Sequence, residues 1–203
     1  VNFQAFASLV DAVGGVDLEV TNEEVQWINA YLNEYNLLEG KEMTTDYLDT
    51  SLSGEIHLNG PQALAYSRNR YIGTDFGRTE RQRKVIEQIV AKAKKFDIGR
   101  LNSILTAVTK NISTSFDINE ILDLATSITK YKLTMVDGGF PFTRNDQIRS
   151  KDGWKFADPV IPVTLESNVV KFHEKLFDST DYTPSTTVKN ISEKIIRLTG
   201  VYE

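Results

Sequence analysis

One predicted helix constrains this chain more than any other feature, because its apolar stripe gives way to arginine at its first turn. The helix is predicted over residues 78–95 by apolar side chains at helical spacing: Val85, Ile86, Ile89, Val90 and Ala93. Arg78 lies seven residues before the first of these and Gln82 seven before the third, so both share the inward face, and Arg81 lies next to it. Because burying an unpaired arginine is costly, this pattern predicts an anionic partner at the helix start.

Arginine is concentrated in the same segment. Five of the nine arginines occur between residues 68 and 83. Over residues 68–84, six positive side chains face two acidic ones, a net of +4, whereas the whole chain carries −5. A local cationic cluster on an acidic chain favours one compact anionic ligand, and it argues against a broad nucleic-acid surface.

The start of this helix has the features of a phosphate site. The first turn of a helix offers unpaired N–H groups and the positive end of the helix dipole, and arginine adds paired hydrogen bonds to phosphate oxygens. Arg68 and Arg70 come from the preceding element, and Asp75 lies in a loop predicted over residues 67–77. Asp75 could orient one or two guanidinium groups or help to hold a metal ion. The alternative is an ordinary solvated face with an ordinary loop acid.

The rest of the chain has the pattern of one compact α/β unit with a helical second half. Internal repeats and linkers rich in proline or glycine are absent. Asn22 is the expected cap of the second helix, and the polar residues 39–55 predict a loop. Strands are predicted at residues 16–20, 132–136 and 160–163. Further helices are predicted at residues 3–13, 22–35, 61–66, 100–110, 118–130, 166–177 and 185–199.

Several kinds of site are excluded by residue usage. The chain has no cysteine and two histidines, so thiol catalysis, disulfides and cysteine-rich zinc sites are ruled out. His173 precedes Glu174, but the second histidine of a zinc-protease helix is missing, and His57 and His173 are expected at surface or packing positions. The sequence contains no run of about 18 apolar residues, so it predicts no membrane span within this chain.

Four aromatic residues allow two interpretations. Trp27, Tyr31, Tyr35 and Trp154 could line a groove for a sugar or a lipid. The helical spacing of the first three favours packing in the core instead.

Two stretches of the sequence resemble the LytR-CpsA-Psr family. The first runs from Leu58 to Arg70 and is followed by Asp75-Phe76-Gly77-Arg78 and by Arg81-Gln82. The second is the segment from Phe6 to Val20, which contains Val-Asp-Ala-Val-Gly-Gly-Val-Asp. Because these matches cover about the first 95 residues, the resemblance implies the C-terminal portion of the family domain at residues 1–95. Residues 96–203 are similar to the C-terminal extension of some members, and we expect them to pack on that domain.

The resemblance also implies a fold and an activity. Members of the family have an α/β/α fold around a mixed central sheet, with an apolar pocket for a polyprenyl tail. They are membrane-anchored, extracytoplasmic enzymes, mainly of Gram-positive bacteria. They transfer glycopolymers, such as teichoic acid or capsular polysaccharide, from a polyprenyl-pyrophosphate carrier onto peptidoglycan. The expected partners are therefore the glycan donor, the peptidoglycan acceptor and the membrane, with no nucleic acid.

The matched motif carries the family's site residues onto this chain. The resemblance implies that Arg68, Arg70, Arg78 and Arg81 contact the pyrophosphate, usually together with Mg²⁺. Gln82 and Asp75 would orient these arginines or the leaving group. Of this set, Asp75 and Arg78 are expected to act in catalysis.

Parts of the family pattern are not found in this chain. An early motif resembling Asp-Ser-Arg-Ser-Asp and a membrane helix have no match. We therefore expect the N-terminal strands, the membrane anchor and most Mg²⁺ ligands to lie outside this chain, which would be the C-terminal part of a longer protein. Two alternatives to a transferase stay open: a protein that binds lipid or glycan without turnover, and a regulator, since family members are often labelled transcriptional regulators.

Overall fold

The chain forms two compact units rather than the single unit expected. The structure, a computed structural model, describes residues 2–109, 112–127, 130–131, 139–145 and 159–202. The two units are Val1–Thr134 and Met135–Glu203. Each unit buries apolar side chains of its own, and Gly138, Gly139 and Pro141 follow shortly after the boundary in the sequence. The division at residue 95 between a family domain and an extension stays a prediction.

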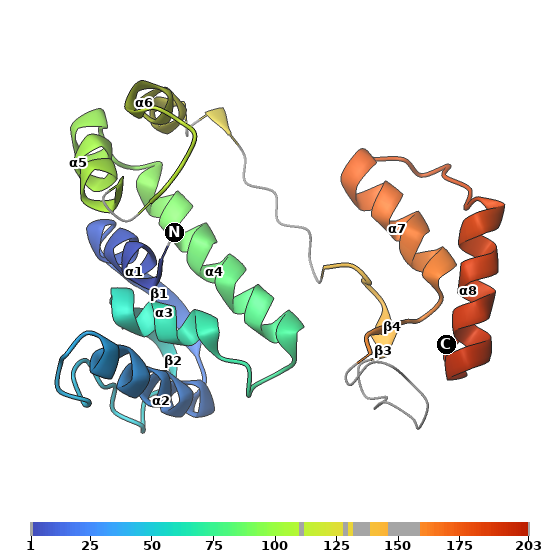
Figure 1. The fold of residues 1–203 in the computed structure, drawn as a ribbon, viewed down its shortest axis with the longest axis horizontal. Coiled ribbons are helices and arrows are strands. Elements are labelled where there is room, and N and C mark those ends of the chain that lie inside the picture. Colours follow the sequence, from blue (N-terminus) through green and yellow to red (C-terminus); the bar gives the residue numbers. More distant parts are fainter. Residues whose placement is uncertain (1, 110–111, 128–129, 132–138, 146–158, 203) are drawn as a thin grey trace. The chain divides into compact units, whose positions relative to one another are not determined.

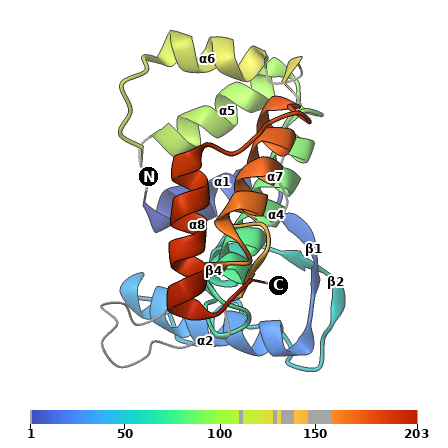
Figure 2. The same ribbon diagram turned by 90° about the vertical axis from the view of Figure 1, so that its right-hand side faces the viewer.

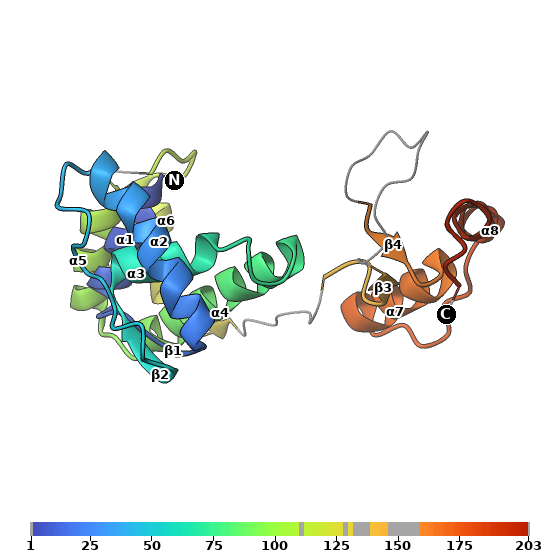
Figure 3. The same cartoon turned by 90° about the horizontal axis from the view of Figure 1, so that it is seen from below.

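The first unit contains most of the helices, and α3 packs against three of them. Its elements are α1 (Phe3–Ala12), β1 (Val16–Val20), α2 (Asn22–Leu38), β2 (Gly54–Leu58), α3 (Gly60–Arg68), α4 (Asp75–Ala93), α5 (Ile98–Thr109) and α6 (Ile118–Thr126). Figure 1 shows α3 between α1, α2 and α4, and α2 lies alongside α3 in Figure 3. Residues 60–67 of α3 are all buried.

The two strands of this unit form an antiparallel pair, which Figure 2 shows side by side. The register runs from Val16 opposite Leu58 to Val20 opposite Gly54. Three side chains of β1 and two of β2 join the buried cluster: Val16, Leu18, Val20, Ile56 and Leu58. The α/β class is confirmed, and within the described residues the sheets are this pair and one further two-stranded pair.

Capping residues fix where the elements begin and end. Gly14 and Gly15 follow α1 with φ of 84° and 74°, a backbone region that favours glycine. The second helix is capped by Thr21 and not, as expected, by Asn22. The Thr21 side chain accepts a hydrogen bond from the Glu24 N–H, and the Glu24 carboxylate accepts one from the Thr21 N–H, so a reciprocal box determines the start.

A close approach of two helices is built around Gly60. Its N–H donates to Asp11 Oδ1 at 2.6 Å. A Cβ at this position would collide with the Ala7 carbonyl oxygen and lie 2.7 Å from Asp11 Oδ2. Only glycine therefore allows α1 and α3 to meet at this point.

Helix α4 begins at Asp75, three residues before the expected start. The loop predicted over residues 67–77 is correspondingly shorter. Gly77 lies in the first turn of this helix, where glycine is tolerated. A Cβ at this position would lie only 3.1 Å from the Ile72 carbonyl oxygen, so the loop and the helix approach closely here.

The second unit pairs two helices with a short antiparallel pair of strands. Its elements are β3 (Arg144–Asn145), β4 (Ile161–Pro162), α7 (Leu165–Phe177) and α8 (Thr186–Thr199). The buried Asn168 side chain joins its parts, because it accepts from the Thr143 N–H and donates to the Thr143, Val163 and Thr164 carbonyls. The strand predicted at residues 132–136 lies outside the described residues. Across the described residues, no helix is both long and apolar enough to cross a membrane.

Candidate functional site

The arginine on the buried face of α4 is Arg81, at the N-terminal end of that face. It is 5% exposed and lies one, two and three turns before Val85, Ile89 and Ala93. The expected order on this face was wrong for Gln82, which is exposed. Ideal helical spacing brings both residues near this face. Arg81 takes the inward position because Glu24 and the carbonyls of Asn69 and Ile72 pair with its guanidinium there.

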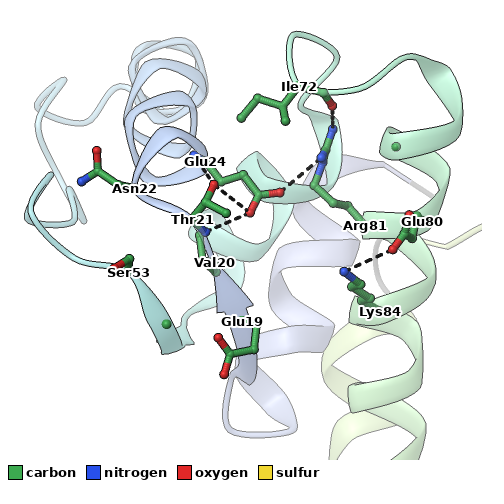
Figure 4. A pocket seen from close by; sticks show the side chains of 12 residues that line it. Glu19, Val20, Thr21, Asn22, Glu24, Ser53, Ile72, Glu80, Arg81 and Lys84 are labelled. Carbon is green, nitrogen blue, oxygen red and sulfur yellow. Dashed lines mark hydrogen bonds and ion pairs between the residues drawn. The ribbon is translucent and has the colours of Figure 1, made fainter.

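The Arg81 guanidinium has partners at both terminal nitrogens, and Figure 4 shows its contacts with Glu24 and Ile72. Nη1 lies 3.2 Å from the buried Glu24 carboxylate, and Nη2 donates to the carbonyls of Asn69 at 2.8 Å and Ile72 at 2.6 Å. The guanidinium also lies over the Tyr66 ring, 6.0 Å from its centroid. Arg81 therefore joins α2, α4 and the loop between α3 and α4.

That loop is folded around Arg81. The Asn69 side chain is buried, and its Oδ1 accepts hydrogen bonds from the N–H groups of Tyr71 and Ile72 at 2.9 and 3.3 Å. The loop backbone is thus bound through its carbonyl groups by Arg81 and through its N–H groups by Asn69. The side chains of Arg70 and Tyr71 remain exposed, at 64% and 68%.

Three of the predicted site residues come together at the start of α4. Asp75 Oδ1 lies 3.3 Å from Arg78 Nη2 and 3.9 Å from Arg70 Nε. The Asp75 side chain is 71% exposed, and Arg78 is largely covered at 24%. Arg78 Nε is buried and has no hydrogen-bond partner among the described residues. We call Arg70, Asp75 and Arg78 the arginine cluster.

Two of the three remaining predicted residues, Arg68 and Gln82, have partners outside the cluster. Arg68 Nη2 lies 3.0 Å from Glu34 Oε2, and its guanidinium lies over the rings of Phe3 and Tyr31. Gln82 Nε2 lies 3.4 Å from the Ser67 carbonyl oxygen, which ties α4 to the end of α3. Contacts of Arg68, Arg81 and Gln82 with a pyrophosphate stay predictions.

The described residues do not fit a Mg²⁺ site. The carboxylate at the cluster, Asp75, is shared by two guanidinium groups, which compete with a cation for its oxygens. Among the parts of the chain that the structure describes, no three acidic or histidine side chains gather around a common point. A role for Mg²⁺ therefore stays a prediction.

A second charged group lies on the β1–β2 pair. Asp17 Oδ1 lies 2.7 Å from His57 Nδ1, and Asp17 Oδ2 lies 2.9 Å from Lys92 Nζ. The hydrogen bonds from His57 and Lys92 hold the pKa of Asp17 below its ordinary value. His57 is thus a surface residue, and His173 stacks on the Tyr182 ring at 3.5 Å, so both occupy the surface and packing positions expected.

A pocket of about 700 Å³ lies between the start of α2 and the start of α4 (Figure 4). Its lining includes Arg81 but none of the arginine cluster. Arg81 pairs with Glu24 in its wall, and Lys84 pairs with Glu80 at 3.3 Å, so its cations already have partners. With Val20 and Ile72 as its only large apolar residues, it does not match the apolar tail pocket that the resemblance implies.

The chain is similar to several curated bacterial proteins. The teichoic acid transferase TagU of Enterococcus faecalis is 36% identical over 145 residues, which cover 68% of this chain and 41% of that protein. TagV of Bacillus subtilis is 25% identical over 190 residues, covering 92% and 44%. Biofilm regulatory protein A of Streptococcus mutans is 33% identical over 154 residues, covering 68% and 35%. The chain spans less than half the length of these relatives.

Solved structures share the fold. The crystal structure of B. subtilis TagV superimposes with a TM-score of 0.54 at 24% identity, over 91% of this chain and 63% of that one. Protein gbs0355 of Streptococcus agalactiae gives 0.55 at 24% identity, over 92% and 58%. The model of the LytR_cpsA_psr family matches residues 1–155. From its sequence motif, its fold and this match, the chain belongs to the LytR-CpsA-Psr family.

Proposed function

We propose that this chain is part of a transferase that attaches a glycopolymer from a polyisoprenyl-pyrophosphate carrier to peptidoglycan. The observation that carries the proposal is the arginine cluster, in which Asp75 holds Arg70 and Arg78 at the start of α4. Curated relatives of the chain are named as polyisoprenyl-teichoic acid–peptidoglycan teichoic acid transferases, which supports this substrate class.

The cluster has the charge and the donors that a pyrophosphate needs. Two guanidinium groups face one carboxylate, so a positive charge is left for the ligand. The positive end of the α4 dipole adds to this charge. The buried Nε of Arg78 is a donor without a partner among the described residues. Because Arg81 and Asn69 fix the loop that carries Arg70, the site is held in place before a ligand arrives.

The chemistry follows from this charge. An acceptor hydroxyl on peptidoglycan attacks the phosphorus next to the glycan and forms a new P–O bond. The bond from that phosphorus to the bridging oxygen breaks, polyisoprenyl phosphate leaves, and the hydroxyl proton passes to solvent. Arg70 and Arg78 stabilise the negative charge that grows on the leaving phosphate, and Asp75, which lies between them, keeps both guanidinium groups aimed at it.

The proposal places the full-length protein at the outer face of the cell membrane, where both substrates occur. The rival functions are binding without turnover and regulation, the latter suggested by the name of the S. mutans relative, Biofilm regulatory protein A. Nucleic acid is not favoured as the partner, because the cluster has two cationic side chains, of which Arg70 is the exposed one, and a DNA-binding face needs more phosphate contacts.

The test is transfer of a labelled glycan from a polyisoprenyl-pyrophosphate donor to peptidoglycan by the full-length protein. Arg78→Ala removes charge-assisted bonds, so we expect the rate to fall by roughly 10- to 100-fold. Arg197→Ala, an exposed arginine of the second unit, is the matched control and keeps the wild-type rate. Donor binding without transfer by the wild type would favour the binding protein, and an active Arg78→Ala variant would refute the site.

A further inference from the structure

Three aromatic rings lie together where the chain neighbours the arginine cluster, and that of Tyr71 is exposed while the other two are half-buried. Trp27 and Tyr31 come from α2, and Tyr71 comes from the loop that Arg81 holds. The rings of Trp27 and Tyr71 stack with centroids 3.9 Å apart and planes 9° apart, and Tyr31 lies 6.4 Å from Tyr71. We call these three residues the aromatic shelf.

The outer face of the Tyr71 ring is open for a ligand. Tyr71 is 68% exposed although Trp27 covers one face of its ring, so the other face is open to solvent. The stack is not needed to hold the loop backbone, because Asn69 and Arg81 bind it directly. A large aromatic ring held rigidly with one open face presents binding area at little cost in conformational entropy.

Charged groups border the shelf on the side of α3. Trp27, Tyr31 and Glu34 lie four and three residues apart, so they share one face of α2. Arg68 lies over the Tyr31 ring at 5.3 Å and pairs with Glu34, whose side chain is 56% exposed. Arg70 of the arginine cluster is the neighbour of Tyr71 in the chain.

This combination selects a sugar. The C–H face of a pyranose packs on a flat aromatic ring, and its hydroxyl groups need donors and acceptors at the ring's edge, which Arg68 and Glu34 provide. A polyprenyl tail would need an enclosed apolar groove instead, and the shelf is an open face bordered by charges.

We propose that the aromatic shelf binds the first sugar of the glycan donor, the one attached to the pyrophosphate. The inference rests on the proposed function, in which Arg70 contacts the pyrophosphate, since the next residue, Tyr71, then stands beside the sugar. It assigns to Tyr71 the recognition of the sugar and leaves the recognition of the phosphates to the arginine cluster.

The test compares two probes on the full-length protein by calorimetry: farnesyl pyrophosphate, and the same molecule with N-acetylglucosamine on its terminal phosphate. We expect the wild type to bind the sugar-bearing probe about tenfold more tightly. Tyr71→Ala removes this difference and keeps the affinity for farnesyl pyrophosphate within about twofold. Tyr71→Phe retains the difference because it keeps the ring. Tyr202→Ala, at a tyrosine with 61% exposure in the second unit, is the matched control.

The outcomes separate this inference from the proposed function. Equal affinity of the wild type for both probes overturns the sugar site alone. Equal weakening of both probes by Tyr71→Ala also overturns it, since Tyr71 would then only shape the loop of Arg70. If farnesyl pyrophosphate itself fails to bind, or binds unchanged to Arg78→Ala, the phosphate site of the proposed function fails instead.

Discussion

Replacing Arg81 by alanine tests the structural basis of the site. The change removes the ion pair with Glu24 and leaves the carbonyls of Asn69 and Ile72 without their donor. Loss of one partner from a buried ion pair costs about 3–5 kcal/mol. Glu24 keeps its hydrogen bond from the Thr21 N–H at 3.0 Å, so its carboxylate retains one donor. We therefore expect the free energy of unfolding of the first unit to fall by about 3 kcal/mol, the lower part of that range.

Urea unfolding followed by tryptophan fluorescence measures this effect. In a Trp154→Phe background Trp27 is the one remaining tryptophan, so the signal reports the first unit alone. Arg81→Lys keeps the charge but loses the planar fork, and it should cost about half as much. A double-mutant cycle with Glu24→Gln should give a coupling energy above about 1 kcal/mol.

Lys84→Ala is the control on the same helix. Lys84 is 47% exposed and pairs with Glu80 one turn earlier, so its loss should cost less than about 0.5 kcal/mol. An effect of Arg81→Ala as small as that of Lys84→Ala would refute the view that Arg81 holds the loop together.

Three further predictions concern other parts of the fold. Gly60→Ala should lower the stability of the first unit by about 2–3 kcal/mol, because the new methyl group meets the Ala7 carbonyl. The control Gly99→Ala meets only a flexible side chain at 3.2 Å and should be tolerated. Equal melting temperatures of the two variants would contradict this prediction. The pKa of Asp17 is lowered on folding, so its ion pairs stabilise the fold above its unfolded pKa and are lost as the pH falls through the folded value. The difference in urea midpoint between wild type and Asp17→Asn should therefore shrink below about pH 4, and a difference that grows there would be inconsistent with a lowered pKa. Asn168→Ala removes hydrogen bonds that join three segments of the second unit, and its thermal unfolding should shift to lower temperature, while an unchanged transition would contradict that role.

Much of the fold was predictable because periodic patterns and turn residues act locally. The strand β1 was confirmed residue for residue by its alternation, and the helices of both units lie close to their predicted ranges. The strand β2 was missed, since Ile56 and Leu58 are its only apolar residues and its partner β1 lies far away in the chain. The cap of α2 was misassigned although the sequence holds the signal, a threonine at 21 followed by a glutamate at 24.

The candidate site was predictable in its composition and less so in its geometry. Clustering and the family motif pointed to Arg70, Asp75 and Arg78, which the structure brings together. The inward role of Arg81 depends on Glu24, which lies 57 residues earlier. No local pattern connects two such residues, because their contact exists only once α2 and α4 have packed. The stacking of Tyr71 on Trp27 could not be predicted from the sequence for the same reason.

Binding of farnesyl pyrophosphate to the full-length protein tests the central claim most directly. The measurement is a calorimetric titration of the wild type, of Arg70→Ala/Arg78→Ala and of the control Arg197→Ala. Two guanidinium groups that each contribute charge-assisted bonds predict an affinity loss of about 100-fold or more in the double variant, with the control unchanged. An unchanged affinity of the double variant would contradict the assignment of the arginine cluster as the pyrophosphate site.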